Sequence, residues 1–153
     1  MDVLADANRL PDSLIHALGE GQTSEEKHFE RVMMFHGNVL NGGLSQAFHN
    51  MSSELASVLN SYRELGIAAL ATLIEIAMHQ SEVVDEAQFE QQAIALDEIY
   101  VSACYGLAYA CNEYKPDHEL AGSDGDIDWV DRLALKYARK NRNKFGFLIA
   151  ACA

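Results

Sequence analysis

Apolar side chains recur at three- and four-residue steps along almost the whole chain, which is the spacing of one face of an α-helix. The clearest stripe consists of Phe29, Val32, Met33, His36, Val39 and Leu40. The same spacing returns over 55–62, 67–78, 86–107 and 129–137, with Ile99 among the residues expected to face inward. No segment has a convincing strand alternation, so the sequence predicts an all-α fold, an orthogonal array of about six to eight helices.

Capping and turn residues predict where the helices begin and end. Thr23, followed three residues later by Glu26, forms a capping box for a helix that starts at residue 24. A first helix is expected near Pro11, and a later one from Glu86 to about Tyr114, followed by a loop over 115–125. Helix breaks are expected at Asn41–Gly43 and at Gly66. N-terminal caps are expected at Ser52 or Ser53 and at Asp126 or Asp128.

The length of 153 residues suits one domain with a single core. A composition of 49% hydrophobic residues with only 2 Pro is typical of a folded globular chain and not of a disordered one. No repeat and no long linker divides the sequence. We therefore expect a single helical domain over residues 1–153.

Charge is distributed unevenly along the chain. Asp and Glu number 23 against 11 Lys and Arg, for a formal net charge of -12. All 23 acidic residues and only five basic ones precede residue 132, whereas residues 132–153 hold six basic residues and no acidic one. Two interpretations remain open: a solvated face that confers solubility, or an acidic surface for a basic partner, with the basic tail packed on the chain or on a second subunit.

The composition excludes several classes of protein. A net negative charge argues against direct binding to nucleic acid or to an anionic membrane, since both require positive surface. Three scattered cysteines are too few for a disulfide framework, which favours a reducing compartment. The acidic N-terminal residues lack a secretory pattern, and the apolar stretch 67–78 is too short for a membrane span. We expect a cytoplasmic protein.

No catalytic or metal-binding pattern emerges, so we expect neither an enzyme nor a cofactor. The six histidines lack the close spacing of zinc ligands, and His36 on an apolar stripe suits a hydrogen-bonded core histidine. Asp124, Asp126 and Asp128 alternate like the start of a calcium loop, but the Gly and Glu that such a loop requires are absent. Cys104 and Cys111 lie two helical turns apart, which suits burial better than redox chemistry.

One segment stands out between two apolar helices. It carries a Gly-Gly break flanked by amides and an aromatic residue, namely Asn41, Gly42, Gly43, Gln46, Phe48 and Asn50. Glycines allow a tight corner, and side-chain amides satisfy backbone groups that are freed at helix ends. The segment is thus interpreted as a structural corner, with a binding cleft there as an alternative.

These residues resemble the NGGxxQxFxN signature of a bacterial family of small helical domains named after a DNA-mimic protein. A second block that contains Phe89, Asp97 and Tyr100 is similar to that family, as is a closing helix with Leu133, Tyr137, Asn141 and Phe145. The resemblance covers about residues 28–147. It implies an all-α homodimer that presents carboxylates in place of DNA phosphates and occupies the DNA-binding surface of a transcription regulator.

The mimic residues themselves do not follow from the matched motifs. From charge density alone, the acidic residues expected to bind a partner are Glu82, Asp85, Glu86, Glu90, Asp97 and Glu98. The expected partner is a basic DNA-binding or nucleic-acid-processing protein. Two alternatives remain: an immunity-type inhibitor of a basic toxin, and a small-ligand binder or enzyme with its site at Asn41–Asn50.

Overall fold

The computed structural model describes residues 23–104 and 128–145. Its elements are α2 (Ser24–Asn50), α3 (Leu55–Glu64), α4 (Ala68–Val83), α5 (Glu86–Ser102), α7 (Trp129–Lys140) and the 3-10 helix η3 (Arg142–Lys144). The all-α class is confirmed for these residues, which contain no strand. Their five α-helices are slightly fewer than the six to eight expected. The helix expected near Pro11, the loop over 115–125 and the continuation of α5 toward Tyr114 lie outside the described residues.

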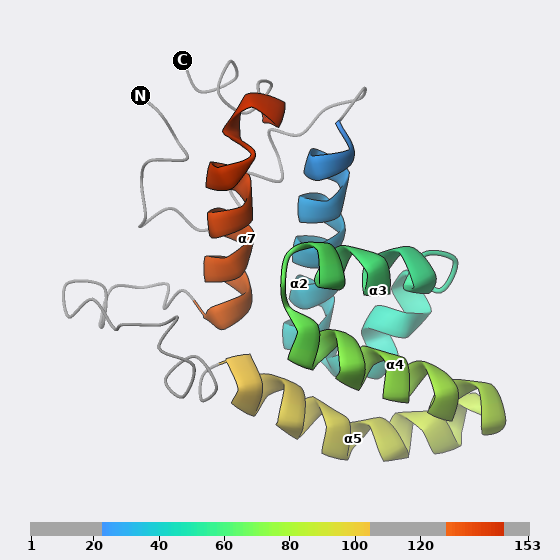
Figure 1. Ribbon diagram of the computed structural model, residues 1–153. Coiled ribbons are helices and arrows are strands. Elements are labelled where there is room, and N and C mark those ends of the chain that lie inside the picture. The colour runs from blue at the N-terminus through green and yellow to red at the C-terminus, as the bar shows by residue number, and fades with distance from the viewer. Residues whose placement is uncertain (1–22, 105–127, 146–153) are drawn as a thin grey trace.

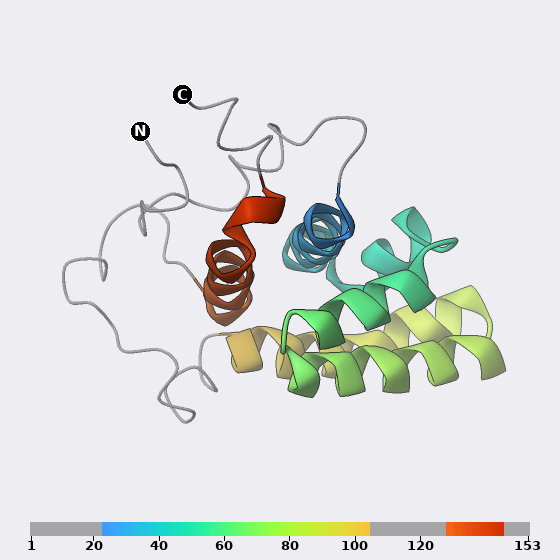
Figure 2. The ribbon, with the colours of Figure 1, turned by 45° about the horizontal axis from the view of Figure 1, so that its top comes forward.

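Helix α2 is the centre of the arrangement, because α3, α5 and α7 all pack against it. Helix α7 runs beside α2, while α3, α4 and α5 lie crosswise to that pair (Figure 1). Helices α4 and α5 pack side by side and form one edge of the described structure (Figure 2). Helix α7, which carries four of the basic residues, therefore packs against α2 of the same chain. Packing on the chain was one of the two arrangements expected for the basic tail.

The buried apolar side chains of the described residues form one continuous cluster, to which α2, α3, α4, α5 and α7 all contribute. Phe29, Phe35 and Tyr62 are fully buried, and the Phe35 and Tyr62 rings meet edge to face at 5.8 Å between centroids. Burying aromatic rings of this size removes a large apolar area from water, which stabilises the crossing of α2 and α3. No described helix is both long and apolar enough to span a bilayer.

The expected inward stripes are wrong at two positions. Leu40 is 45% exposed and Ile99 is 55% exposed, whereas Phe35, which was not on the expected stripe, is fully buried. Helix α2 is covered on several sides, so its buried surface is wider than one stripe. Helix α5 packs along a single narrow line, Phe89, Ala93 and Tyr100, which leaves the neighbouring Ile99 in solvent.

Most of the predicted boundaries are confirmed. The Thr23 hydroxyl accepts from the Glu26 N–H and the Glu26 carboxylate accepts from the Thr23 N–H, which is the capping box. Asp128 caps α7, and Gly66, with φ of 80°, ends α3. The cap expected at Ser52 or Ser53 is wrong, because α3 begins after Glu54 without a side-chain cap. A backbone turn, in which the Glu54 N–H donates to the Met51 carbonyl, occupies that place.

Candidate functional site

The Gly42–Gly43 break bends α2 instead of ending it. Both glycines leave the helical region, and the segments on either side form one kinked element. Gly43 has φ of 79°, a left-handed conformation that side chains with a Cβ disfavour. A Cβ on Gly42 would collide with the Gln46 side chain. The corner therefore requires glycine at residue 43, whereas a Cβ at residue 42 would displace the end of the flexible Gln46 side chain.

Asp97 closes this corner from α5. Its carboxylate accepts the Leu44 N–H at 2.7 Å, and a Cβ on Gly43 would lie only 2.5 Å from its Oδ2. Burial raises the pKa of the half-buried Asp97 carboxyl above its usual value, and the Leu44 hydrogen bond acts in the opposite direction. Asp97 was expected on the partner-binding surface, but the structure uses its carboxylate to hold the α2 kink.

The remaining motif residues divide between core and surface. Phe48 is buried, with ring centroids 6.1 Å from Phe35 and 5.2 Å from Phe89. The Asn50 amide donates to the Asn38 side-chain oxygen at 2.7 Å on the surface, which links the two arms of the kink. Asn41 is exposed. The motif thus fastens α2 to itself and to α5.

The other five acidic residues expected to bind a partner are exposed, at the end of α4 and along α5. They are Glu82, Asp85, Glu86, Glu90 and Glu98. Asp85 also caps α5 by accepting the Gln88 N–H, and Glu86 lies 3.5 Å from the exposed His49 imidazole. Residues 64–104 contain no Lys or Arg, so neither α4 nor α5 carries a cation that would neutralise this acidic face.

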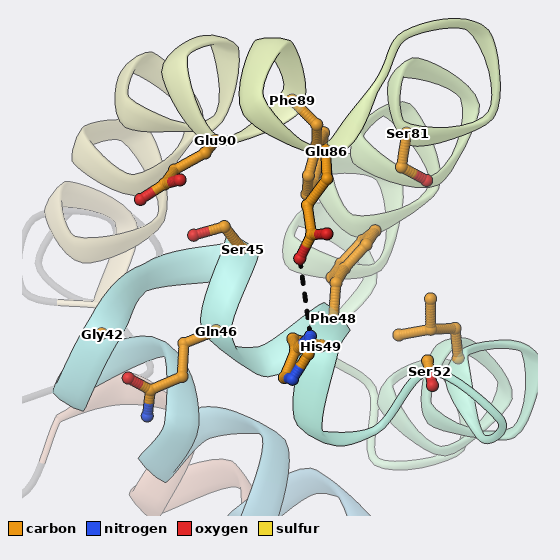
Figure 3. Close-up of a pocket in the computed structure, with 11 residues that line it drawn as sticks. Gly42, Ser45, Gln46, Phe48, His49, Ser52, Ser81, Glu86, Phe89 and Glu90 are labelled. Atoms are coloured by element: carbon orange, nitrogen blue, oxygen red, sulfur yellow. Dashed lines mark ion pairs between the residues drawn. The ribbon is translucent and has the colours of Figure 1, made fainter.

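A groove joins the Gly-Gly corner to the acidic face (Figure 3). Its volume is about 620 Å³, and it is lined by Gly42, Ser45, Gln46, Phe48, His49, Ser52, Leu55, Ser81, Glu86, Phe89 and Glu90. Phe48 and Phe89 form its apolar part, and Glu86 and Glu90 lie on the α5 side (Figure 3). The structure thereby brings together two groups that the sequence analysis treated separately. His49, Ser52 and Ser81 were missed, because nothing local to them indicates a groove.

A buried polar chain ties four helices together away from the groove. The His36 imidazole contacts the Asp128 carboxylate at 2.5 Å through Nε2 and the Tyr100 hydroxyl at 2.9 Å through Nδ1. The Tyr100 hydroxyl lies 2.6 Å from that of Tyr62. The expectation of a hydrogen-bonded core histidine at His36 is confirmed. Its partners were not foreseen, since they lie 64 and 92 residues away in the sequence.

Each side chain of this buried chain has a hydrogen-bond partner within it. Burial raises the pKa of Tyr62 and Tyr100 well above 10, so both hydroxyls keep their protons. The Tyr100 hydroxyl lies between the Tyr62 hydroxyl and Nδ1 of His36, and Nε2 of the same ring bonds to the Asp128 carboxylate. The second oxygen of that carboxylate accepts the Asp131 N–H and caps α7. Asp128 therefore joins the buried chain to the start of α7.

The same place holds a possible set of metal ligands. Ligand atoms of His36, Cys104 and Asp128 all lie within 4.8 Å of one another, and the three residues are buried. Burial and the Asp128 carboxylate raise the pKa of the Cys104 thiol well above its usual value, which favours the protonated form. Both nitrogens of His36 already have hydrogen-bond partners. The arrangement suits a structural anchor, and the absence of a metal from the chain stays a prediction.

Comparison with known proteins gives one match. A family model described as DMP19-like protein matches residues 20–141, a range close to the 28–147 of the resemblance noted in the sequence. No curated protein and no solved structure matches the chain significantly. The matched range contains the groove, the acidic face, and the whole of both the kinked α2 and α7. The chain belongs to the DMP19-like protein family.

Proposed function

We propose that this chain is an acidic, non-enzymatic protein-binding module that acts as a DNA mimic. Its acidic face would occupy the DNA-binding surface of a basic partner such as a transcription regulator. The observation that carries the proposal is the set of exposed carboxylates on α4 and α5, in a stretch without Lys or Arg. Membership of the DMP19-like family is compatible with this role.

The physical basis is charge complementarity. Lys and Arg side chains that contact DNA phosphates can be satisfied equally by carboxylates on a rigid helical surface. Ion pairs between exposed groups are screened by salt, so the complex is expected to weaken steeply as ionic strength rises. DNA and the module would compete for one surface of the partner. A pull-down with the immobilised protein, eluted by salt or by duplex DNA, therefore tests the proposal and isolates the partner.

Neutralising the acidic face is expected to abolish that capture. In the variant Glu82→Gln, Asp85→Asn, Glu86→Gln, Glu90→Gln, four exposed ion pairs at about 0.7 kcal/mol each would be lost, which weakens binding about 100-fold. Asn at residue 85 still caps α5, so the helical CD spectrum is expected to remain unchanged.

A matched control removes the same charge elsewhere. The variant Glu25→Gln, Glu30→Gln, Glu54→Gln, Glu64→Gln changes the net charge equally, but its positions lie on α2, at the N-cap of α3 and at the end of α3. It is expected to weaken capture much less, as measured by the Kd for the isolated partner. Equal losses in both variants would mean that net charge alone attracts the partner, and wild-type binding by the first variant would refute the surface assignment.

The chain is further proposed to form a homodimer. Helix α5 leaves Ile99 55% exposed on the side of the helix opposite to Glu90, and a second copy packed on that side would remove this apolar side chain from water without covering Glu90. Light scattering is expected to give twice the 16.9 kDa of one chain. A mass of one chain at every concentration would contradict the dimer.

Two other functions use parts of the same surface. An immunity-type inhibitor would use the acidic face against a basic toxin, and a captured nuclease that loses its activity would indicate this role. A small-ligand binder would use the groove at Gly42–Phe48, whose volume of about 620 Å³ is typical of ligand pockets. A metabolite that raises the Tm of the wild type but not of Gln46→Ala would favour the latter.

A further inference from the structure

The groove combines three chemical features that are rarely found together on a solvated acidic face. It has an apolar part from Phe48 and Phe89, two carboxylates from Glu86 and Glu90, and neutral acceptors from Ser45 and Gln46. A simple solubilising surface needs only the carboxylates. The exposed edges of two otherwise buried rings beside two carboxylates match a side chain that has both an aliphatic stem and a cationic end.

The two carboxylates lie on the same side of the groove and have free access to solvent. Glu86 and Glu90 are one helical turn apart on α5, so their side chains are neighbours on the same face. In Figure 3 the two side chains leave α5 in different directions, Glu86 toward His49 and Glu90 toward the side of the groove where Ser45 lies. Within the described residues, the ionic neighbour of Glu86 is the exposed His49, and no ion pair involves Glu90. Neither carboxylate is buried, so both remain available to an incoming cation.

We propose that this groove receives an arginine side chain of the basic partner, together with the residues that flank it. The inference rests on the proposed function and gives the acidic face one defined anchoring point. The aliphatic stem would pack over Phe48 and Phe89, and the guanidinium would lie between Glu86 and Glu90.

Arginine fits this arrangement better than lysine. A guanidinium is planar and offers five donors, so it can bridge two carboxylates and still donate to a neutral acceptor such as the Gln46 amide oxygen. It also packs on aromatic rings at a lower desolvation cost than an ammonium. The groove volume of about 620 Å³ exceeds the needs of one side chain, which is why the occupant includes the flanking residues.

The test uses a defined probe and the full chain. The ¹⁵N-labelled protein is titrated with the blocked peptide acetyl-Gly-Arg-Gly-amide, and amide chemical shifts are followed by NMR. The expected shifts centre on Ser45, Gln46, His49, Glu86 and Glu90 and saturate in the millimolar range. A citrulline peptide keeps the shape of arginine without its charge and is expected to bind at least about tenfold more weakly.

A matched pair of variants locates the binding energy. The double variant Glu86→Gln, Glu90→Gln is expected to bind the arginine peptide about tenfold more weakly than the wild type. Glu82→Gln with Glu98→Gln removes the same charge from residues that do not line the groove, and it is expected to change the affinity less than about twofold. All four residues are exposed, so the Tm of each variant serves as the check on folding.

Each other outcome overturns the inference in a recognisable way. Equal losses in the two variants would mean diffuse attraction without a groove site. Equal binding of the citrulline peptide would indicate a pocket for neutral ligands, and equal binding of a lysine peptide would remove the arginine preference. If the variant Glu82→Gln, Asp85→Asn, Glu86→Gln, Glu90→Gln loses the natural partner while Glu86→Gln with Glu90→Gln keeps it, the mimic function stands and the groove anchor fails. If both keep the partner, the proposed function fails as well.

Discussion

The variant Asp128→Ala is expected to lose about 2–5 kcal/mol of the free energy of unfolding. Two physical effects add up at this residue. Removing the acceptor leaves the buried Nε2–H of His36 unsatisfied, which costs about 1–3 kcal/mol. The start of α7 also loses the side-chain cap to the Asp131 N–H, which costs about 0.5–2 kcal/mol. Urea unfolding followed by far-UV CD measures the sum.

Asp85 offers the matched control for Asp128→Ala. It also caps a helix, by accepting the Gln88 N–H at 2.8 Å, but it is exposed and takes no part in a buried chain. Asp85→Ala is therefore expected to cost only the capping contribution, about 1 kcal/mol. The difference between the two variants reports the buried contact with His36. If Asp128→Ala costs no more than Asp85→Ala, the polar chain adds nothing to stability.

The variant Gly43→Ala is expected to lower the free energy of unfolding by about 2–5 kcal/mol. Alanine in the left-handed region at φ of 79° costs about 1–2 kcal/mol. Its Cβ would also lie 2.5 Å from Asp97 Oδ2, so the carboxylate has to move away from the Leu44 N–H. Losing the acceptor of that N–H adds about 1–3 kcal/mol. Thermal or urea unfolding provides the measurement.

The control variant Gly66→Ala separates the free-energy cost of a left-handed alanine from the cost of displacing the Asp97 carboxylate. Gly66 has φ of 80°, almost the same conformation, but a Cβ there would meet nothing within 4 Å. Its substitution is expected to cost only the left-handed contribution of about 1–2 kcal/mol. Effects on the unfolded chain are common to both variants and cancel in the comparison. Equal losses would show that Asp97 does not hold the kink.

Features that depend on neighbouring residues could be predicted from the sequence. The capping box of Thr23 and Glu26, the cap at Asp128 and the stop at Gly66 each rely on contacts within a few residues. Their spacing in the chain is itself the geometry that forms the hydrogen bond. The glycine corner was also predicted, because two successive glycines mark a backbone that leaves the helix.

Features that depend on helix packing were mispredicted or missed. Ile99 has an apolar side chain on a helix, but whether it is buried depends on which neighbour covers that side of α5. Charge density does not distinguish Asp97 from Glu98, although one holds the corner and the other is exposed. The family resemblance includes Asp97 but does not indicate its contact with the α2 kink. The groove combines residues from α2, α3, α4 and α5, and no pattern of neighbouring residues in the sequence predicts that they meet.

The sequence by itself determined the helical class, most helix ends and the segregation of charge, because these follow from periodicity, local hydrogen bonds and the order of residues. Only the tertiary structure decided the partners of His36 and Leu44, which lie 92 and 53 residues away at Asp128 and Asp97. It also decided that the acidic residues of α5 border an aromatic groove. Such contacts arise when helices distant in the chain cross, and a crossing depends on the packing of all the buried side chains together.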